Sequence, residues 1–117
     1  MSFKSYKDLL VWQKSMDFIV LIYKSAKDLP KEEIYGLTSQ LKRAALSVAA
    51  NIAEGSSKRS TKEFMRFIAI SYGSLAETET LLIAAEKLGY IKDADLKMIL
   101  EQSAEIGRML NGLRNSL

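Results

Sequence analysis

Apolar residues recur every three or four positions along almost the whole chain, and this spacing constrains the fold more than any other feature. A period near 3.6 residues places such side chains on one face of an α-helix, whereas a half-buried strand alternates every second residue. The pattern is interrupted near Pro30, Gly36, Gly55 and Gly89. It therefore predicts separate amphipathic helices that bury their apolar faces against one another.

The first predicted helix covers residues 4–28 and ends before Pro30. Its apolar stripe consists of Leu9, Trp12, Met16, Ile19, Tyr23 and Ala26, widened by Val11, Phe18 and Ile22. A face this wide predicts contact with two neighbours, either within the bundle or in another subunit. Pro30 and the acids that follow it predict a short turn, which Gly36 closes.

Three further helices follow from the same pattern. Residues 38–56 form an alanine-rich helix whose expected core positions are Leu41, Ala45, Val48 and Ile52. Ser60 and Glu63 make a capping box, so the next helix begins at about Thr61 and runs to Leu88, before Gly89. Its expected core residues are Phe64, Phe67, Ile68, Leu75, Leu82 and Ala85. Asp93 is the expected cap of the last helix, whose apolar seam is Leu96, Ile99, Ser103, Ile106, Leu110, Leu113 and Leu117.

Short links between long helices favour antiparallel neighbours, which predicts an all-α, up-down-up-down four-helix bundle. With 117 residues the chain is expected to form a single domain spanning residues 1–117. The longest apolar run, at residues 18–23, is too short to span a membrane, and residues 1–6 lack an apolar signal core. We therefore expect a cytoplasmic protein without a membrane partner.

The composition argues against catalysis. The chain has no cysteine and no histidine, which removes thiolate nucleophiles, the commonest general base and the commonest transition-metal ligands. Glutamates on the last two helices do not supply the Glu-x-x-His pairs of dimetal bundles. No glycine-rich phosphate loop is present. We expect neither an enzyme nor a bound metal or cofactor.

Four cations surround the expected start of the third helix: Lys58, Arg59, Lys62 and Arg66. The helix dipole favours anions at that end, so the position of these cations suggests an external anionic partner. A phosphate could dock there, near free backbone N–H groups. The alternative is a solvated charged face that Glu63 partly neutralises.

A second polar feature lies on the predicted second helix. Spacings of three and four place its members within roughly a quarter of the helix circumference. We call it the polar seam; it consists of Gln40, Arg43, Ser47, Asn51 and Glu54. The seam either contacts another subunit or lines the lumen of a ring, where its polar groups satisfy one another, or it is a plain solvent-facing stripe.

Several segments resemble the four-helix-bundle proteins encoded in intervening sequences of bacterial 23S ribosomal RNA genes. They include Leu9-x-Val11-Trp12-Gln13-Lys14, the run from Gly36 to Ala44, Asn51-Ile52-Ala53-Glu54-Gly55, Gly73-Ser74-Leu75 and Leu88-Gly89-Tyr90. The resemblance implies a homopentameric ring and a similarity to the accessory proteins of diversity-generating retroelements, which bind nucleic acid. Lys58 departs from the Arg common in the family and gives up bidentate phosphate recognition.

The sequence thus predicts a non-catalytic homo-oligomeric scaffold that binds structured RNA or DNA. The alternative is a scaffold that binds a protein partner, with the basic residues serving solubility alone. The net charge of +3 is compatible with both predictions.

Overall fold

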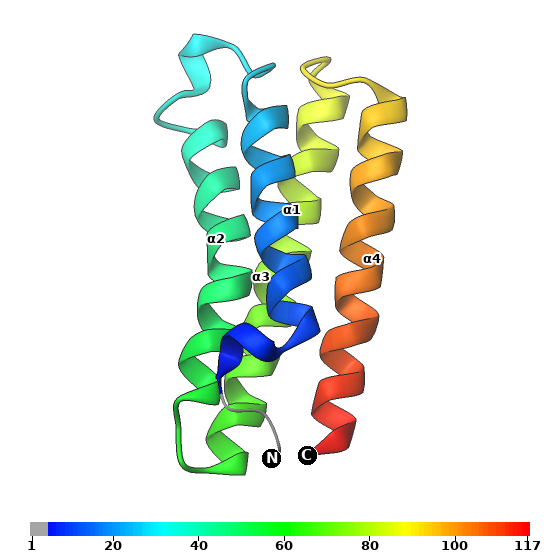
Figure 1. Cartoon of the computed structure of the whole chain (residues 1–117). Helices are drawn as coiled ribbons and strands as arrows, with labels where there is room; N and C mark the ends of the chain where they lie inside the picture. Colours follow the sequence, from blue (N-terminus) through cyan, green and yellow to red (C-terminus); the bar gives the residue numbers. More distant parts are fainter. Residues whose placement is uncertain (1–4) are drawn as a thin grey trace.

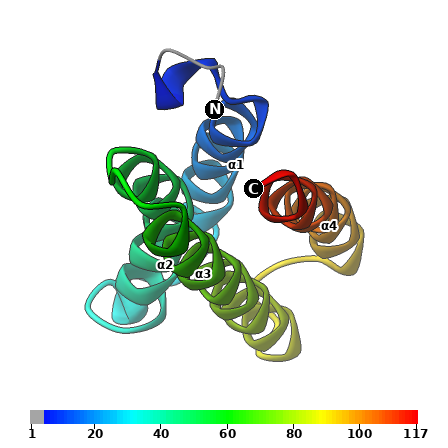
Figure 2. The same cartoon turned by 90° about the horizontal axis from the view of Figure 1, so that it is seen from below.

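The computed structural model describes residues 5–117 and confirms the up-down-up-down four-helix bundle (Figure 1). Its helices are α1 (Leu10–Ala26), α2 (Leu37–Ser56), α3 (Thr61–Lys87) and α4 (Asp93–Ser116), with short 3₁₀ turns at Tyr6–Asp8 and Lys31–Glu33. Helices α1 and α3 each pack against α2 and α4, so the four surround one apolar core (Figure 2). Within residues 5–117 no helix is long and apolar enough to cross a membrane.

Helix α1 begins at Leu10, so the predicted start at Lys4 was wrong for residues 5–9; Lys4 itself lies outside the described residues. The Ser5 hydroxyl accepts a hydrogen bond from the Lys7 N–H and caps the 3₁₀ turn. Leu9 then has extended backbone, which separates this turn from the helix. Because of this local cap, α1 begins later in the chain than apolar spacing alone suggests.

The buried face of α1 is rotated from the predicted centre. Phe18 and Ile22 are fully buried, whereas Met16 and Tyr23, placed in the middle of the predicted stripe, are 40% and 37% exposed. Ser15 fits into the core because its hydroxyl donates to the carbonyl of Val11. The wide apolar face thus touches its neighbours in the bundle along one edge and leaves the other edge in solvent.

Helices α2 and α3 approach closely, and small side chains allow it. The Ser71 hydroxyl of α3 donates a 2.7 Å hydrogen bond to the Val48 carbonyl of α2. At the far end of the pair, a Cβ on Gly55 would lie 2.5 Å from the Phe67 Cβ and 3.1 Å from Phe64 Cδ1. The predicted core residues of both helices are buried, as expected: Leu41, Ala45, Val48, Ile52, Phe64, Phe67, Ile68, Leu75, Leu82 and Ala85.

The predicted start of α3 at Thr61 is confirmed, its end lies one residue before the predicted Leu88, and the start of α4 shifts by one residue. The Ser60 hydroxyl accepts from the Glu63 N–H at 3.2 Å, and Gly89 has φ of +82° after the helix end. Asp93 was predicted as the cap of α4, but the N-cap residue is Lys92, and Asp93 forms an ion pair with Lys97 at 3.1 Å. The α4 seam is buried from Leu96 to Leu110, and Leu113 and Leu117 are half-buried.

Candidate nucleic-acid interface

The four predicted cations gather at one end of the bundle, where α2 connects to α3 (Figure 1). Lys58 and Arg59 lie in the connecting loop, and Lys62 and Arg66 lie in the first two turns of α3. All four are exposed. We call these four residues the basic cluster.

The ring of Phe67 holds two members of the cluster together. The Lys58 Nζ lies 5.4 Å from the centroid of this ring, and the Arg66 guanidinium carbon lies 4.6 Å from it. Phe67 itself is buried against Gly55. Cations over an aromatic face are attracted by its quadrupole, so the α2–α3 contact fixes the spacing of two charges that come from different elements.

Glu63 is the acid within this cluster. Its carboxylate accepts a 3.0 Å hydrogen bond from Arg66 Nε. That hydrogen bond and the guanidinium charge lower the pKa of Glu63, and Lys58 and Lys62 lower it further. Glu63 is therefore ionised at neutral pH and neutralises Arg66 in part. Within residues 5–117 no carboxylate lies within ion-pair distance of the other three cations.

Replacing Glu63 by Gln should strengthen the binding of a polyanion to this end. The amide keeps the length needed for the capping box but frees Arg66 for a phosphate. We expect the salt dependence of binding to steepen by about one unit of slope per contacting copy. Because the pKa of Glu63 is lowered, wild type should acquire this extra affinity only when the pH falls through that lowered pKa.

The control for Glu63→Gln is a variant that removes one negative charge elsewhere in the protein. Glu105→Gln removes one carboxylate from an exposed ion pair with Lys14 on the other side of the bundle. Fluorescence anisotropy with a labelled RNA hairpin should separate the two variants. Equal effects of Glu63→Gln and Glu105→Gln would show that only total charge matters and not the position of Glu63.

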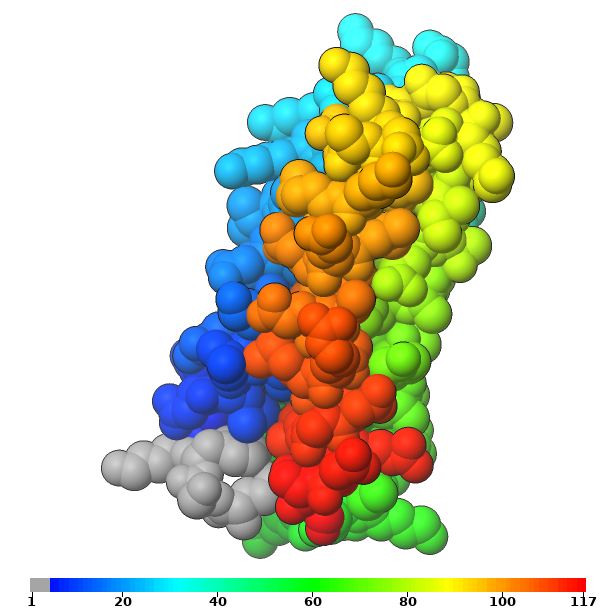
Figure 3. All heavy atoms as spheres, turned by 90° about the vertical axis from the view of Figure 1, so that its right-hand side faces the viewer, coloured from blue at the N-terminus to red at the C-terminus, as the bar shows by residue number. Residues whose placement is uncertain are grey.

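Arg114 is a cation at this end that the sequence analysis did not identify. It lies in the last turn of α4, at the same end of the bundle as the α2–α3 connection (Figures 1 and 3). Its separation of about fifty residues from the cluster leaves no local signal in the sequence. Only the antiparallel order of α3 and α4 brings it to the same end of the molecule.

The polar seam faces the side of α2 that meets α3. Asn51 donates to the carbonyl and to the hydroxyl oxygen of Ser47, both at 2.8 Å, and the Ser74 hydroxyl donates to Ser47 Oγ at 2.9 Å. The structure thus joins the middle of the seam to α3 within one protomer. The remaining seam residues, Gln40, Arg43 and Glu54, are exposed.

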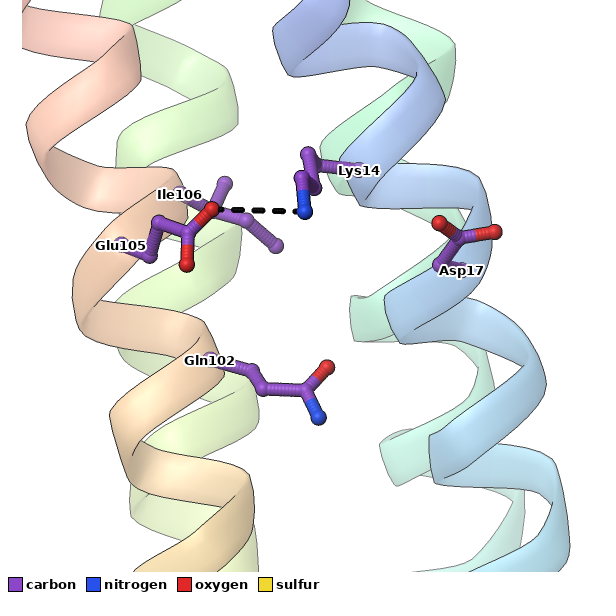
Figure 4. A pocket seen from close by; sticks show the side chains of 5 residues that line it. All are labelled: Lys14, Asp17, Gln102, Glu105 and Ile106. Carbon is purple, nitrogen blue, oxygen red and sulfur yellow. Dashed lines mark ion pairs between the residues drawn. The ribbon is translucent and has the colours of Figure 1, made fainter.

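A hollow of about 260 Å³ lies between α1 and α4, away from the cluster (Figure 4). It is lined by Lys14, Asp17, Gln102, Glu105 and Ile106. Lys14 Nζ lies 3.6 Å from Glu105 Oε1, so the one cation of the hollow already has an acidic partner. With two acids against one lysine, this hollow is electrostatically unfavourable for a phosphate.

One glutamate of α3 links α3 to α4. Glu79 accepts a 2.6 Å hydrogen bond from the fully buried hydroxyl of Ser103, which joins the two helices. Within residues 5–117 no three acidic side chains are grouped so that they could hold a metal ion.

Comparison with known proteins identifies the family. The family model described as 23S rRNA-intervening sequence protein matches residues 7–112. A solved structure of a protein of unknown function, from the S23 ribosomal protein family of Bacteroides thetaiotaomicron VPI-5482, is 27% identical. The two align with a TM-score of 0.82 over 90% of this chain and 98% of that one. No curated protein matches. The chain belongs to the 23S rRNA-intervening sequence protein family.

Proposed function

We propose that this protein is a non-catalytic, cytoplasmic, homo-oligomeric scaffold that binds structured RNA or DNA through the basic cluster. The observation that carries the proposal is the position of Lys58, Arg59, Lys62 and Arg66 at one end of the bundle, where Glu63 is ion-paired with Arg66. Exposed cations on a rigid helical framework supply contacts to phosphates, which fix position and give salt-sensitive affinity.

The charge distribution along the bundle supports this choice of end. The opposite end contains the α1–α2 and α3–α4 connections, where acids and cations balance (Figure 1). Residues 27–33 hold two lysines and three acids, and residues 86–97 hold three lysines and three acids. Residues 54–66, in contrast, hold four cations and two acids. Among the three connections, the α2–α3 connection is therefore the one with an excess of positive charge.

The resemblance to pentameric relatives leads us to include a homopentamer in the proposal. Five copies, each with a net charge of +3, would carry +15 and repeat one cationic patch around a ring. A long polyanion could then contact several patches at once, and linked contacts raise avidity far above the affinity of one patch. Light scattering should give a mass five times 13.1 kDa.

The experiment reverses the four charges of the basic cluster to Glu and measures binding to a labelled RNA hairpin and a DNA duplex across a salt series. The matched control reverses four lysines at the opposite end, which are Lys24, Lys27, Lys31 and Lys92, all exposed. Both variants have the same net charge. We expect the cluster variant to lose binding by about a thousandfold or more at low salt, because several phosphate contacts disappear, and the control to lose far less.

Three results would count against the proposal. Salt-independent binding would exclude a phosphate-dominated contact. Equal losses in the cluster variant and the control variant would mean that total charge, and not the basic cluster, attracts the polyanion. No binding by wild type would leave the protein-scaffold alternative, in which a protein occupies an exposed apolar surface.

A further inference from the structure

A depression of about 280 Å³ lies between α3 and α4, toward the end of the bundle that carries the basic cluster. We call it the α3/α4 depression; it is lined by Ile68, Ala69, Tyr72, Asn111 and Arg114. Ile68 is buried, so the inner end of the depression is apolar, whereas Tyr72 is 45% exposed. Pockets that hold small molecules have volumes from roughly 300 Å³ upward, so this depression has room for a single planar ring.

The α3/α4 depression is continuous with the basic cluster along α3. Ala69, in its lining, follows Arg66 by three residues and Lys62 by seven, so the three side chains lie on one side of the helix. On the other wall, Arg114 lies in the last turn of α4. Figure 3 shows this end of α4 and the α2–α3 connection at the same end of the molecule. Both helices therefore carry cations where the depression approaches the basic cluster.

The lining of the depression is positively charged. It includes no acid, and in the described part of the chain, residues 5–117, Arg114 forms no ion pair. An adjoining depression of about 310 Å³ shares Tyr72 and Asn111 and adds one cation, Arg108, and one acid, Glu79. Glu79 already accepts a 2.6 Å hydrogen bond from α4. Two arginines against one carboxylate favour a phosphate-bearing ligand over an aromatic side chain from a protein.

Tyr72 and Asn111 supply the chemistry that recognises a base. The Tyr72 ring lies over Gly107 of α4, where an added Cβ would be 3.5 Å from Tyr72 Cε2, so α4 holds the ring without covering it with a side chain. Aromatic rings of this kind stack on unpaired bases. The Asn111 amide is exposed and makes no hydrogen bond within residues 5–117, so its donor and its acceptor are both available to a base edge.

We propose that the α3/α4 depression receives one unpaired base of the nucleic acid, while the basic cluster and Arg114 contact the phosphates on either side of that base. This inference rests on the proposed function and adds the class of ligand, which is a nucleic acid with an unpaired loop, bulge or end. A base inside a continuous duplex is paired and stacked, and its extrusion costs free energy. An unpaired base enters without that cost.

The test compares an RNA hairpin that has an unpaired loop with a blunt RNA duplex of the same number of phosphates, by fluorescence anisotropy. We expect wild type to bind the hairpin about tenfold to a hundredfold more tightly, because one base stacks on an aromatic ring. Tyr72→Leu should lose this preference, since leucine is apolar but has no ring. Tyr72→Phe should keep it, because stacking requires the ring and not the hydroxyl.

The matched control is Tyr35→Leu. Tyr35 lies in the α1–α2 connection at the opposite end of the bundle and is 95% exposed, so this change also removes one tyrosine ring and no charge. It should leave the preference for the hairpin unchanged. Circular dichroism checks that every variant keeps the helix content of wild type. Because Tyr72→Leu removes no cation, its salt dependence of binding should equal that of wild type, whereas reversal of the basic cluster should reduce it.

Several outcomes would overturn the inference. Equal affinity of wild type for hairpin and duplex would show that no base is recognised, although salt-sensitive binding would still support the basic cluster. Equal effects of Tyr72→Leu and Tyr35→Leu would place the base elsewhere. A mass of Tyr72→Leu by light scattering that differs from wild type would mean that a second copy fills the depression. No binding by wild type would overturn both proposals. A hairpin preference that survives reversal of the basic cluster would support the depression and contradict the proposed function.

Discussion

Gly55→Ala is expected to destabilise the protein by about 2–3 kcal/mol, although alanine is the better helix former. The added Cβ would lie 2.5 Å from the Cβ of Phe67, an atom attached directly to the α3 backbone, so no side-chain rotation relieves the clash. The two helices must move apart at this point. The gain in helix propensity, roughly 1 kcal/mol, offsets only part of that cost.

The matched control is Gly112→Ala on α4, where an added Cβ would meet nothing within 4 Å. It should stabilise the protein by about 0.5–1 kcal/mol, because alanine loses less backbone freedom on folding. Urea unfolding followed by circular dichroism gives both values. A Gly55 variant as stable as the Gly112 variant would show that α2 and α3 are not in tight contact at this end.

The close packing of Gly55 gives a physical reason for the glycine that ends the Asn51-Ile52-Ala53-Glu54-Gly55 segment. Gly55 lets Phe67 approach α2, and the Phe67 ring in turn positions Lys58 and Arg66. Separating the helices should therefore also weaken polyanion binding, even though the change adds no charge. A destabilised Gly55 variant that keeps full affinity would separate the packing role of the glycine from the geometry of the cluster.

Helix number, order and most boundaries could be predicted from the sequence because those signals are local. Ser60 and Glu63 mark the start of α3, and Gly89 marks its end, through backbone hydrogen bonds and a positive φ within a few residues. The start of α1 was wrong because apolar spacing continues through residues that a serine cap holds in a 3₁₀ turn.

The candidate site could be predicted only in part. The four cations of the basic cluster are close in sequence, so their proximity followed directly. The role of Phe67 between Lys58 and Arg66 did not, since it depends on how closely α2 and α3 approach. Arg114 was missed for the same reason, because it is far from the basic cluster in sequence.

Phe18→Ala is expected to cost about 3–5 kcal/mol and Met16→Ala less than about 1 kcal/mol. The two residues lie two positions apart on a helix whose apolar face is wide enough for either to be central. Phe18 is fully buried, so its removal leaves a cavity, whereas Met16 is 40% exposed and its side chain can be lost with little change inside the bundle. The pair therefore reports the rotation of α1 about its axis.

That rotation determines which apolar side chains α1 exposes, since turning Met16 inward would also carry Val20 and Tyr23 toward the core. Both substitutions are compared at one protein concentration, because subunit contacts would add to the free energy of unfolding of an oligomer. Urea unfolding should show a large loss in the free energy of unfolding for Phe18→Ala and a small one for Met16→Ala. A larger loss for Met16→Ala than for Phe18→Ala would mean that Met16 lies at the centre of the buried face, as the sequence pattern predicts.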